Sequence, residues 1–369
     1  MAGPLNPMEG VVLLPGDCGV SRHELAVHHI LGCKIAALLG TRFLGEFDPA
    51  RHGQGRFYFI PGEALTIAQA RERGIHGPED FFGGMVERAF MATKAITHPL
   101  PEHARQVPEG WSRAFSAEVA NAILDGVTAF DLGDAQMAGE RLLERGPIRL
   151  KPVLAKAGRG QQVIRDHLAL AEHLAAQNAE EIAAWGLVLE ENLNEVVTFS
   201  VGQVQVGDQL ASYYGSQRLT RDNLGEVVYG GSDLTVVRGD YAELMRLDMP
   251  EAIRLAVSQA QVYERAALAA LGLSASRRNY DVAQGVDDRG NPRSGVLEQS
   301  WRVGGASAAE IFALEAFAGD PRLLCVRAST YECYGENLPP DDALPLYEGD
   351  EPEIGRIGKY VTVEPHAVP

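Results

Sequence analysis

Short apolar runs and helix-forming segments alternate along most of this chain, and this alternation restricts its fold more than any other feature. Residues 11–14 form a buried-strand run before a Pro-Gly turn, and Ser21 is a candidate N-cap for a helix that continues to Leu39. Residues 57–60 form a second apolar run, and residues 66–73 predict another helix. The pattern predicts an α/β (α+β) fold that begins with a small open α/β unit.

The remaining elements are predicted in the same way, from apolar residues at helical spacing and from runs typical of strands. Helices are expected over residues 116–124, 134–145, 166–184, 241–271 and 306–317, and strands over 148–154, 185–190, 196–206, 279–286 and 295–301. The predicted units are an N-terminal α/β domain over 1–95, a smaller subdomain over 96–185, a larger one over 186–336 and a C-terminal tail over 337–369. The tail is rich in proline and acidic residues, which predicts surface or flexible chain.

Composition narrows the classes of function. Hydrophobic residues make up 46% of the 369 and charged residues 22%, as in ordinary globular proteins. The net charge of −17 disfavours nucleic-acid binding, which needs a basic surface. The chain has no basic signal-peptide start and no apolar run near the roughly 20 residues that a membrane span requires. We therefore expect a cytoplasmic protein that binds neither nucleic acid nor a membrane.

A strand with a lysine, followed by a loop with two glycines, is the first candidate site. Lys151 lies on the strand, and the loop before the next helix contains Gly158, Arg159, Gly160 and Gln161. Glycine lets backbone N–H groups approach phosphate oxygens, and the two basic side chains add positive charge. The spacing matches neither a Walker loop nor a dinucleotide-binding fingerprint, and a plain turn is the alternative.

Acidic residues mark the end of the next apolar strand. The segment contains Glu190, Glu191, Asn192 and Leu193, with Glu195 just beyond. Such a strand end offers backbone hydrogen bonds to an adenine base and a carboxylate to a ribose. The alternative is a strand end whose acids are simply solvated.

Two carboxylates are predicted to face each other on adjacent strands near the C-terminal end. A hairpin centred between residues 289 and 290 sets Asp281 opposite Glu298. Ser300 shares the face of Glu298, because side chains alternate along a strand. Adjacent carboxylates repel unless a cation lies between them, and magnesium prefers such oxygen ligands. The alternative is a pair of surface acids or an ion pair with Arg302.

Taken in this order, the three candidate sites resemble the ATP-grasp superfamily of ATP-dependent carboxylate ligases. In that family a lysine precedes a glycine-rich loop over the triphosphate, a strand-end acid and hinge hold the nucleoside, and a late Asp…Glu-x-Asn set binds magnesium. The resemblance covers residues 94–317 and implies an ATP-grasp fold after an N-terminal α/β domain. Within the superfamily, the runs Leu-Glu-Gln-Ser-Trp-Arg-Val-Gly-Gly and Thr-His-Pro-Leu-Pro resemble a bacterial branch of unknown function.

The resemblance implies a role for each matched residue. The residues implied to contact ATP are Lys94, Lys151, Gly158, Arg159, Gly160, Gln161, Glu190, Glu191, Asn192, Leu193 and Glu195. The metal would be held by Asp281, Glu298 and Ser300, with Mg²⁺ expected and Mn²⁺ as the alternative. Ser300 replaces the usual asparagine, the loop has less glycine than is usual, and the choice between Glu190 and Glu191 stays open.

The implied activity is that of an ATP-dependent ligase, most often one that forms a carbon–nitrogen bond. ATP would phosphorylate a small-molecule or peptide carboxylate, and an amine or thiol would then displace phosphate. Arg302 and Arg218 are candidates for binding the carboxylate or acyl phosphate, because guanidinium binds such groups with two hydrogen bonds. The other class is a nucleotide-binding sensor or inactive relative, which the replacement at Ser300 favours. The sequence names neither substrate and leaves monomer and homodimer open.

Overall fold

The computed structural model describes residues 7–14, 16, 20–53, 55–154 and 160–366. Helices and sheets are mixed throughout these residues, which confirms the predicted α/β class. Within them the strands form four sheets, two of three strands, one of four and one of eight. Every helix in this part of the chain is too short or too polar to cross a lipid bilayer.

The N-terminal unit is built on a three-stranded parallel sheet. In it, β1 (Gly10–Leu14) lies between β2 (Phe43–Glu46) and β3 (Phe57–Pro61). The helix α1 (Arg22–Leu38) begins after Ser21, whose side chain takes part in a capping box. The predicted strands, cap and helix are therefore confirmed.

A second small sheet ties this unit to the rest of the chain. Its strands are β13 (Ser274–Ala275), β5 (Gly84–Val86) and β4 (Leu65–Thr66). The short helical segments of this region are α2 (Pro49–His52), α3 (Ile67–Glu72), η1 (Pro78–Asp80), η2 (Ala89–Ala92) and η3 (Lys94–Ile96). The Gly84 N–H donates to the Trp301 carbonyl at 2.7 Å. This bond attaches the N-terminal unit to the chain three residues after Glu298.

A four-stranded antiparallel sheet follows, in the order β6, β9, β7, β8. Its strands are β6 (Gly126–Ala129), β7 (Ile148–Pro152), β8 (Gln162–Ile164) and β9 (Leu187–Glu191). The helices of this part are α4 (Arg113–Val119), α5 (Leu132–Leu143), α6 (His167–Ala175) and α7 (Ala179–Trp185). The single helix predicted over 166–184 is two helices, because the Asn178 side chain caps a new start. β9 belongs to this sheet, although it follows the predicted boundary at residue 186.

The eight-stranded sheet has the order β15, β14, β10, β11, β12, β16, β18, β17. Its strands are β10 (Asn194–Val206), β11 (Gln209–Arg221), β12 (Val227–Arg238), β14 (Arg277–Val286), β15 (Pro292–Ser300), β16 (Cys325–Tyr334), β17 (Leu344–Glu351) and β18 (Gly355–Pro365). After β12 come α8 (Tyr241–Leu244) and α9 (Glu251–Ala270), and α10 (Ser307–Gly319) follows β15.

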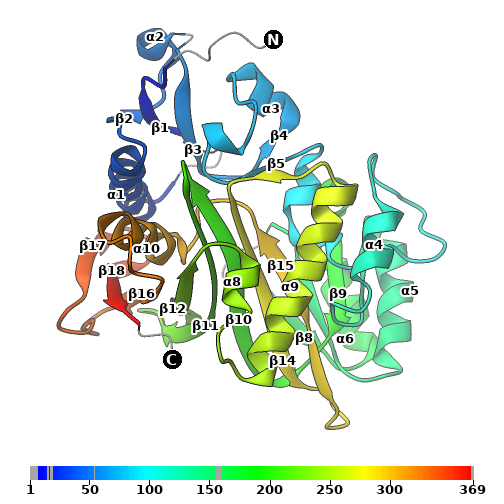
Figure 1. Cartoon of the computed structure of the whole chain (residues 1–369). Coiled ribbons are helices and arrows are strands. Elements are labelled where there is room, and N and C mark those ends of the chain that lie inside the picture. Colours follow the sequence, from blue (N-terminus) through cyan, green and yellow to red (C-terminus); the bar gives the residue numbers. More distant parts are fainter. Residues whose placement is uncertain (1–6, 15, 17–19, 54, 155–159, 367–369) are drawn as a thin grey trace.

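Helices cover both faces of this large sheet. On one face α9 packs over β14 and β15, where Tyr280, Val282 and Val296 are buried. On the other face α10 packs over β11 and β12, against Tyr213 and Leu234, and α1 lies beside α10. Figure 1 shows α9 running along β14 and β15, with α1 and α10 together near β16 and β18.

Residues 344–365 are not a flexible tail, so that prediction is wrong for them. β17 and β18 complete the large sheet, and β18 pairs with β16 over nine residues. Val361 of β18 is fully buried in the same cluster as α10. Proline and acidic residues dominate the composition up to residue 353, and they obscure the alternation of apolar residues that builds β18.

Candidate functional site

Lys151 and Glu190 form a buried ion pair in the four-stranded sheet. They lie on neighbouring strands, β7 and β9, and their side chains are 6% and 3% exposed. Lys151 Nζ contacts Glu190 Oε1, and His98 Nε2 lies 3.0 Å from Glu190 Oε2. Both carboxylate oxygens of Glu190 therefore have a partner inside the protein.

The surroundings of Glu190 favour its ionised form. Burial alone would raise its pKa, but the charge of Lys151 and the hydrogen bond from His98 lower the pKa to about 2. His98 reaches this position because residue 126 is glycine: a Cβ there would lie 2.5 Å from His98 Nδ1. Nδ1 itself has no hydrogen-bond partner among the described residues.

Glu191 has a different set of partners. Arg293 donates to both of its carboxylate oxygens at 2.7–3.0 Å, and the Asp125 N–H donates to Oε1 at 2.9 Å. Adjacent residues of a strand face opposite sides of the sheet. Glu190, and not Glu191, is therefore the acid that lies with Lys151.

The segment after β9 is buried at Asn192 and Leu193 and exposed at Glu195. Asn192 is buried, and its Oδ1 accepts a hydrogen bond from Arg149 at 2.8 Å. Leu193 is buried in a small apolar cluster with Ala283. Glu195 is exposed with a φ of 53°, which makes it the only non-glycine residue with a positive φ in the described ranges.

The predicted phosphate loop falls only partly within the described residues. Gly158 and Arg159 lie outside them. Gly160 is exposed with a φ of 69°, a left-handed value that glycine adopts without strain. Gln161 Oε1 accepts a hydrogen bond from Arg149 at 3.4 Å. Arg149, which the sequence did not single out, therefore connects this loop to the hinge after β9.

Asp281 on β14 and Glu298 on β15 are directly opposite each other, as predicted. The hairpin is centred on Arg289 rather than between residues 289 and 290, which alone would shift the pairing. A β-bulge at Leu297 adds one residue to β15 and brings the two carboxylates back into register. Bulges often re-aim side chains beside functional sites.

This carboxylate pair holds an excess of negative charge. Burial and the neighbouring Glu298 raise the pKa of Asp281 to about 6. Asn279 Nδ2 donates to Asp281 Oδ1 at 2.9 Å, and Lys94 Nζ lies 3.0 Å from Glu298 Oε2. Glu298 stays 37% exposed, so a ligand can reach the pair from solvent.

The two carboxylates fit a magnesium ion. Mg²⁺ takes oxygen ligands, typically one or two carboxylates completed by water and nucleotide phosphates. Among the described residues, no three His, Cys, Asp or Glu side chains gather into a metal site. An ion bound by Asp281 and Glu298 would therefore complete its coordination with other oxygens, such as those of water or phosphate.

Ser300 lies opposite Asn279 and on the face of Glu298. Its Oγ accepts a hydrogen bond from Arg277 at 3.2 Å. The guanidinium thus places positive charge where the third metal ligand was predicted, which disfavours direct coordination. Arg277 and Asn279 were not singled out in the sequence, although they alternate with Asp281 along β14.

Lys94 lies on η3, which contacts both β9 and β15. The Gln299 side chain supports this segment by donating to the Thr93 carbonyl at 2.8 Å. The segment therefore joins the Glu190 cluster of one sheet to the carboxylate pair of the other.

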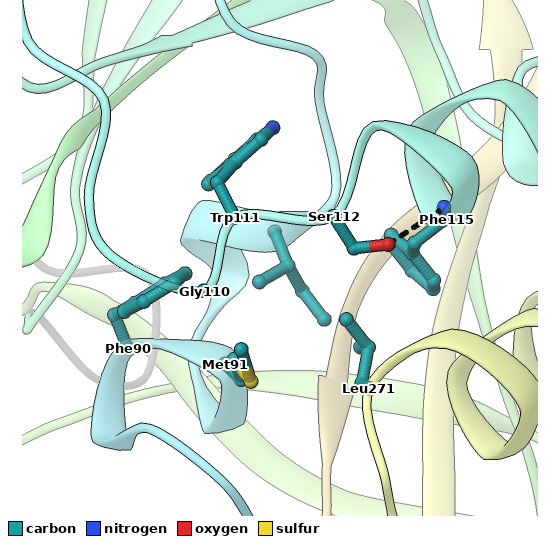
Figure 2. Close-up of a pocket in the computed structure, with 8 residues that line it drawn as sticks. Phe90, Met91, Gly110, Trp111, Ser112, Phe115 and Leu271 are labelled. Atoms are coloured by element: carbon teal, nitrogen blue, oxygen red, sulfur yellow. Dashed lines mark hydrogen bonds between the residues drawn. The ribbon is translucent and has the colours of Figure 1, made fainter.

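An aromatic cluster packs behind this segment. Figure 2 shows Phe90 and Trp111 face to face, and their ring centroids are 5.9 Å apart with an 11° interplanar angle. The cavity between them, Met91 and Leu271 has a volume of about 10 Å³, room for one water at most. The cavity is therefore too small for a ligand, and the packed side chains around it support the backbone near Lys94.

The two candidate arginines lie in different places. Arg302 follows β15, and its Nε lies 3.3 Å from Glu63 Oε2 of the N-terminal unit. Arg218 lies on the face of the large sheet opposite Asp281, as the register through β10 and β11 requires. It pairs with Asp233, which lines a groove of about 460 Å³ on that far face. The structure therefore does not bring Arg218 to the carboxylates.

No curated protein matches this chain. Similar solved structures include a phosphoribosylamine–glycine ligase from Thermotoga maritima, with 12% identity and a TM-score of 0.49 over 96% of this chain and 92% of that one. A D-alanyl-alanine synthetase A from Vibrio cholerae has 11% identity and a TM-score of 0.44 over 80% and 89%. A RiPP-associated ATP-grasp ligase from Chryseobacterium gregarium, in complex with ADP and a leader and core peptide, has 7% identity and 0.35 over 80% and 90%.

These TM-scores are all below 0.5, so the function proposed below rests on the residues of the chain itself. A protein family, in contrast, matches most of the sequence. Its match extends over residues 11–361 under the description "Protein of unknown function (DUF3182)", and the chain belongs to this family.

Proposed function

We propose that this chain binds Mg²⁺–ATP between its four-stranded and eight-stranded sheets and uses it to activate a carboxylate. The observation that carries the proposal is the opposed pair of Asp281 and Glu298, with Lys94 beside it. The single charge of Lys94 does not neutralise two carboxylates, so the pair favours a further cation. A magnesium triphosphate would add that cation and would give Lys94 phosphate oxygens to contact.

Each sheet contributes one part of the proposed site, in the order that resembles the ATP-grasp superfamily. The four-stranded sheet and its connecting segments would bind phosphates through Lys151 and residues 158–161 and adenine through residues 190–193, and Glu195, at the start of β10, would bind ribose. The eight-stranded sheet would bind Mg²⁺, or Mn²⁺, through Asp281 and Glu298. Ser300 is the weakest member of the metal set, because Arg277 engages its hydroxyl.

The proposed reaction has two transfers. A carboxylate oxygen attacks the γ-phosphorus of ATP, the bond to the β–γ bridging oxygen breaks, and ADP leaves. An amine or thiol then attacks the acyl carbon, inorganic phosphate leaves, and the nucleophile loses its proton to solvent. Lys94 and Lys151 would hold the phosphates, and Arg302 would hold the carboxylate or acyl phosphate. Magnesium, when bound, would neutralise charge on the phosphate oxygens.

The proposed substrates are small-molecule or peptide carboxylates and amines, and the proposed location is the cytoplasm, where ATP is abundant. A nucleotide-binding protein without ligase activity is the second candidate. The observation that favours it is the hydrogen bond from Arg277 to Ser300, which weakens the metal set. The two buried lysines and both carboxylates favour the ligase.

The test is release of ADP and phosphate from ATP and Mg²⁺ in the presence of pooled carboxylates and amines. The ligase predicts release that needs both an acid and an amine and is lost in Glu298→Gln. A matched control is Glu243→Gln, which changes a half-exposed carboxylate of α8 that pairs with Arg246. Binding of Mg²⁺–ATP without acceptor-dependent release would support the second candidate, and no binding would contradict both.

A further inference from the structure

Two consecutive arginines of β14 lie on opposite faces of the large sheet, and each is held by a buried glutamate. Arg277 pairs with Glu310 of α10, at 2.9 Å from Nε to Oε2 and 2.7 Å between the second nitrogen and Oε1. Arg278 pairs with Glu264 of α9 at 3.1 Å. Only Arg277 shares the face of Asp281, because the two residues are four apart along the strand.

Arg277 also holds the end of the strand that carries Glu298. Its remaining nitrogen donates to the Ser300 carbonyl at 2.9 Å, to Ser300 Oγ at 3.2 Å and to the Arg302 carbonyl at 2.6 Å. A guanidinium can reach all these groups because its five N–H donors lie in one rigid plane, and the two hydrogens of the remaining nitrogen are shared among the three oxygens.

A second set of contacts runs from Glu310 to the other carboxylate. The Tyr213 hydroxyl lies 2.6 Å from Glu310 Oε1 and 3.0 Å from Asn279 Oδ1. Asn279 Nδ2 then donates to Asp281 Oδ1 at 2.9 Å. Glu310 of α10 is thus connected to both strands of the carboxylate pair through Arg277, Tyr213 and Asn279, which are all buried.

We infer that Arg277 and Glu310 are positioning residues, which fix Asp281 and Glu298 in the geometry that binds magnesium. This inference rests on the function proposed above. In this account Ser300 belongs to the support held by Arg277 and is not a metal ligand. Residues that hold metal ligands in place without touching the metal commonly lower metal affinity when they are replaced.

The test compares two double variants. Replacing both members of a buried ion pair by apolar residues often leaves stability unchanged, so Arg277→Met/Glu310→Leu is expected to fold. The matched control is Arg278→Met/Glu264→Leu, which removes the neighbouring pair on the opposite face. Far-UV circular dichroism and thermal unfolding without ligand check the fold of each.

The measured quantity is the gain in ATP affinity when Mg²⁺ replaces EDTA. We expect Arg277→Met/Glu310→Leu to reduce this gain by roughly ten-fold or more, as is typical when a residue that orients metal ligands is replaced. ATP affinity in EDTA should stay unchanged, and the control should keep the full gain. A purely structural role would lower thermal stability in both double variants and leave the magnesium gain intact.

Two further variants keep the inference open to contradiction. If the first double variant is unfolded, Arg277→Lys replaces it, since a single nitrogen cannot hold Glu310 and the Ser300 segment together. Ser300→Ala should keep most of the magnesium gain. A full gain in the Arg277 variants, or its loss in Ser300→Ala, would overturn the inference. A wild type without any magnesium gain would instead contradict the proposed function itself.

Discussion

Two lysine–glutamate pairs lie close to η3, which contacts both β9 and β15, and the same two residue types behave differently in each. In the four-stranded sheet, Glu190 is buried, and Lys151 and His98 take both of its oxygens. In the eight-stranded sheet, Glu298 is partly exposed, contacts Lys94 and faces a second carboxylate, Asp281. The first pair is electrostatically complete, whereas the second has one negative charge too many.

The pKa directions express the same difference. Lys151 and His98 overcome the effect of burial and lower the pKa of Glu190 to about 2, whereas burial and Glu298 raise the pKa of Asp281 to about 6. A buried acid with its partners in place stabilises the fold even without a ligand. An acid held against another acid is suited to a cation that arrives with a ligand.

The largest expected effect is the loss of the Glu190 charge. Glu190→Gln leaves Lys151 buried without a counter-charge, which should lower the free energy of unfolding by about 3–5 kcal/mol at neutral pH. Glu298→Gln, measured without nucleotide, should cost less than about 1 kcal/mol, because Glu298 is 37% exposed and its neutralisation also removes its repulsion with Asp281. Urea unfolding measures the free energy of unfolding of both variants. Equal losses in the two would contradict the difference between the two pairs.

The pH dependence of that effect has a definite sign. The folded pKa of Glu190 is about 2, below its ordinary value, so its ionised form stabilises the folded state. This contribution is complete above pH about 4.5 and is lost as the pH falls through about 2. The difference between wild type and Glu190→Gln should therefore shrink toward acid. A difference independent of pH would show that the Glu190 charge is not its source.

Asp281→Asn should raise the free energy of unfolding, whereas Glu190→Gln should lower it. The folded pKa of Asp281 lies above its ordinary value of 3.8, so stability is lost as the pH rises through about 6. The variant should be more stable than wild type by on the order of 1–2 kcal/mol above that pH, and by less in acid. Thermal unfolding over a pH series measures it, with the exposed Asp208→Asn as control. A loss of stability at alkaline pH would contradict the account of this pair.

A further expected effect concerns the packing of His98 beside Glu190. A Cβ at residue 126 would lie 2.5 Å from His98 Nδ1, so Gly126→Ala should displace the ring and cost about 1–3 kcal/mol. Gly319→Ala is the control, because an added Cβ there meets no atom within 4 Å. If both variants are equally stable, His98 is not packed as tightly as the comparison requires.

The sequence predicts the local features of this molecule well. Ser21 begins its helix as expected, because capping depends on neighbouring residues, whereas Asp281 faces Glu298 only because a β-bulge offsets the shifted centre of the hairpin. The β-bulge at Leu297 was not predicted, since a single inserted residue leaves no periodic signal. β17 and β18 were missed because the composition around them is typical of flexible chain.

The long-range partners were beyond prediction. Arg277 and Glu310 are 33 residues apart, and Glu190 meets His98 across 92 residues. One signal could have been used: Glu310 is the only charged residue among the first eight of its helix, and apart from Ser307 the others are apolar. Such an acid needs a buried partner, and the only way to identify it is to know which strand the helix covers.

The central claim is that Asp281 and Glu298 bind the magnesium of Mg²⁺–ATP. Isothermal titration of ATP, with Mg²⁺ and with EDTA, tests it directly in the wild type and in Asp281→Asn/Glu298→Gln. We predict that Mg²⁺ tightens ATP binding to the wild type by roughly ten-fold or more, which is about 1.4 kcal/mol, and that the double variant loses this gain while it stays folded. An equal gain in both proteins, or no gain in the wild type, would contradict the account.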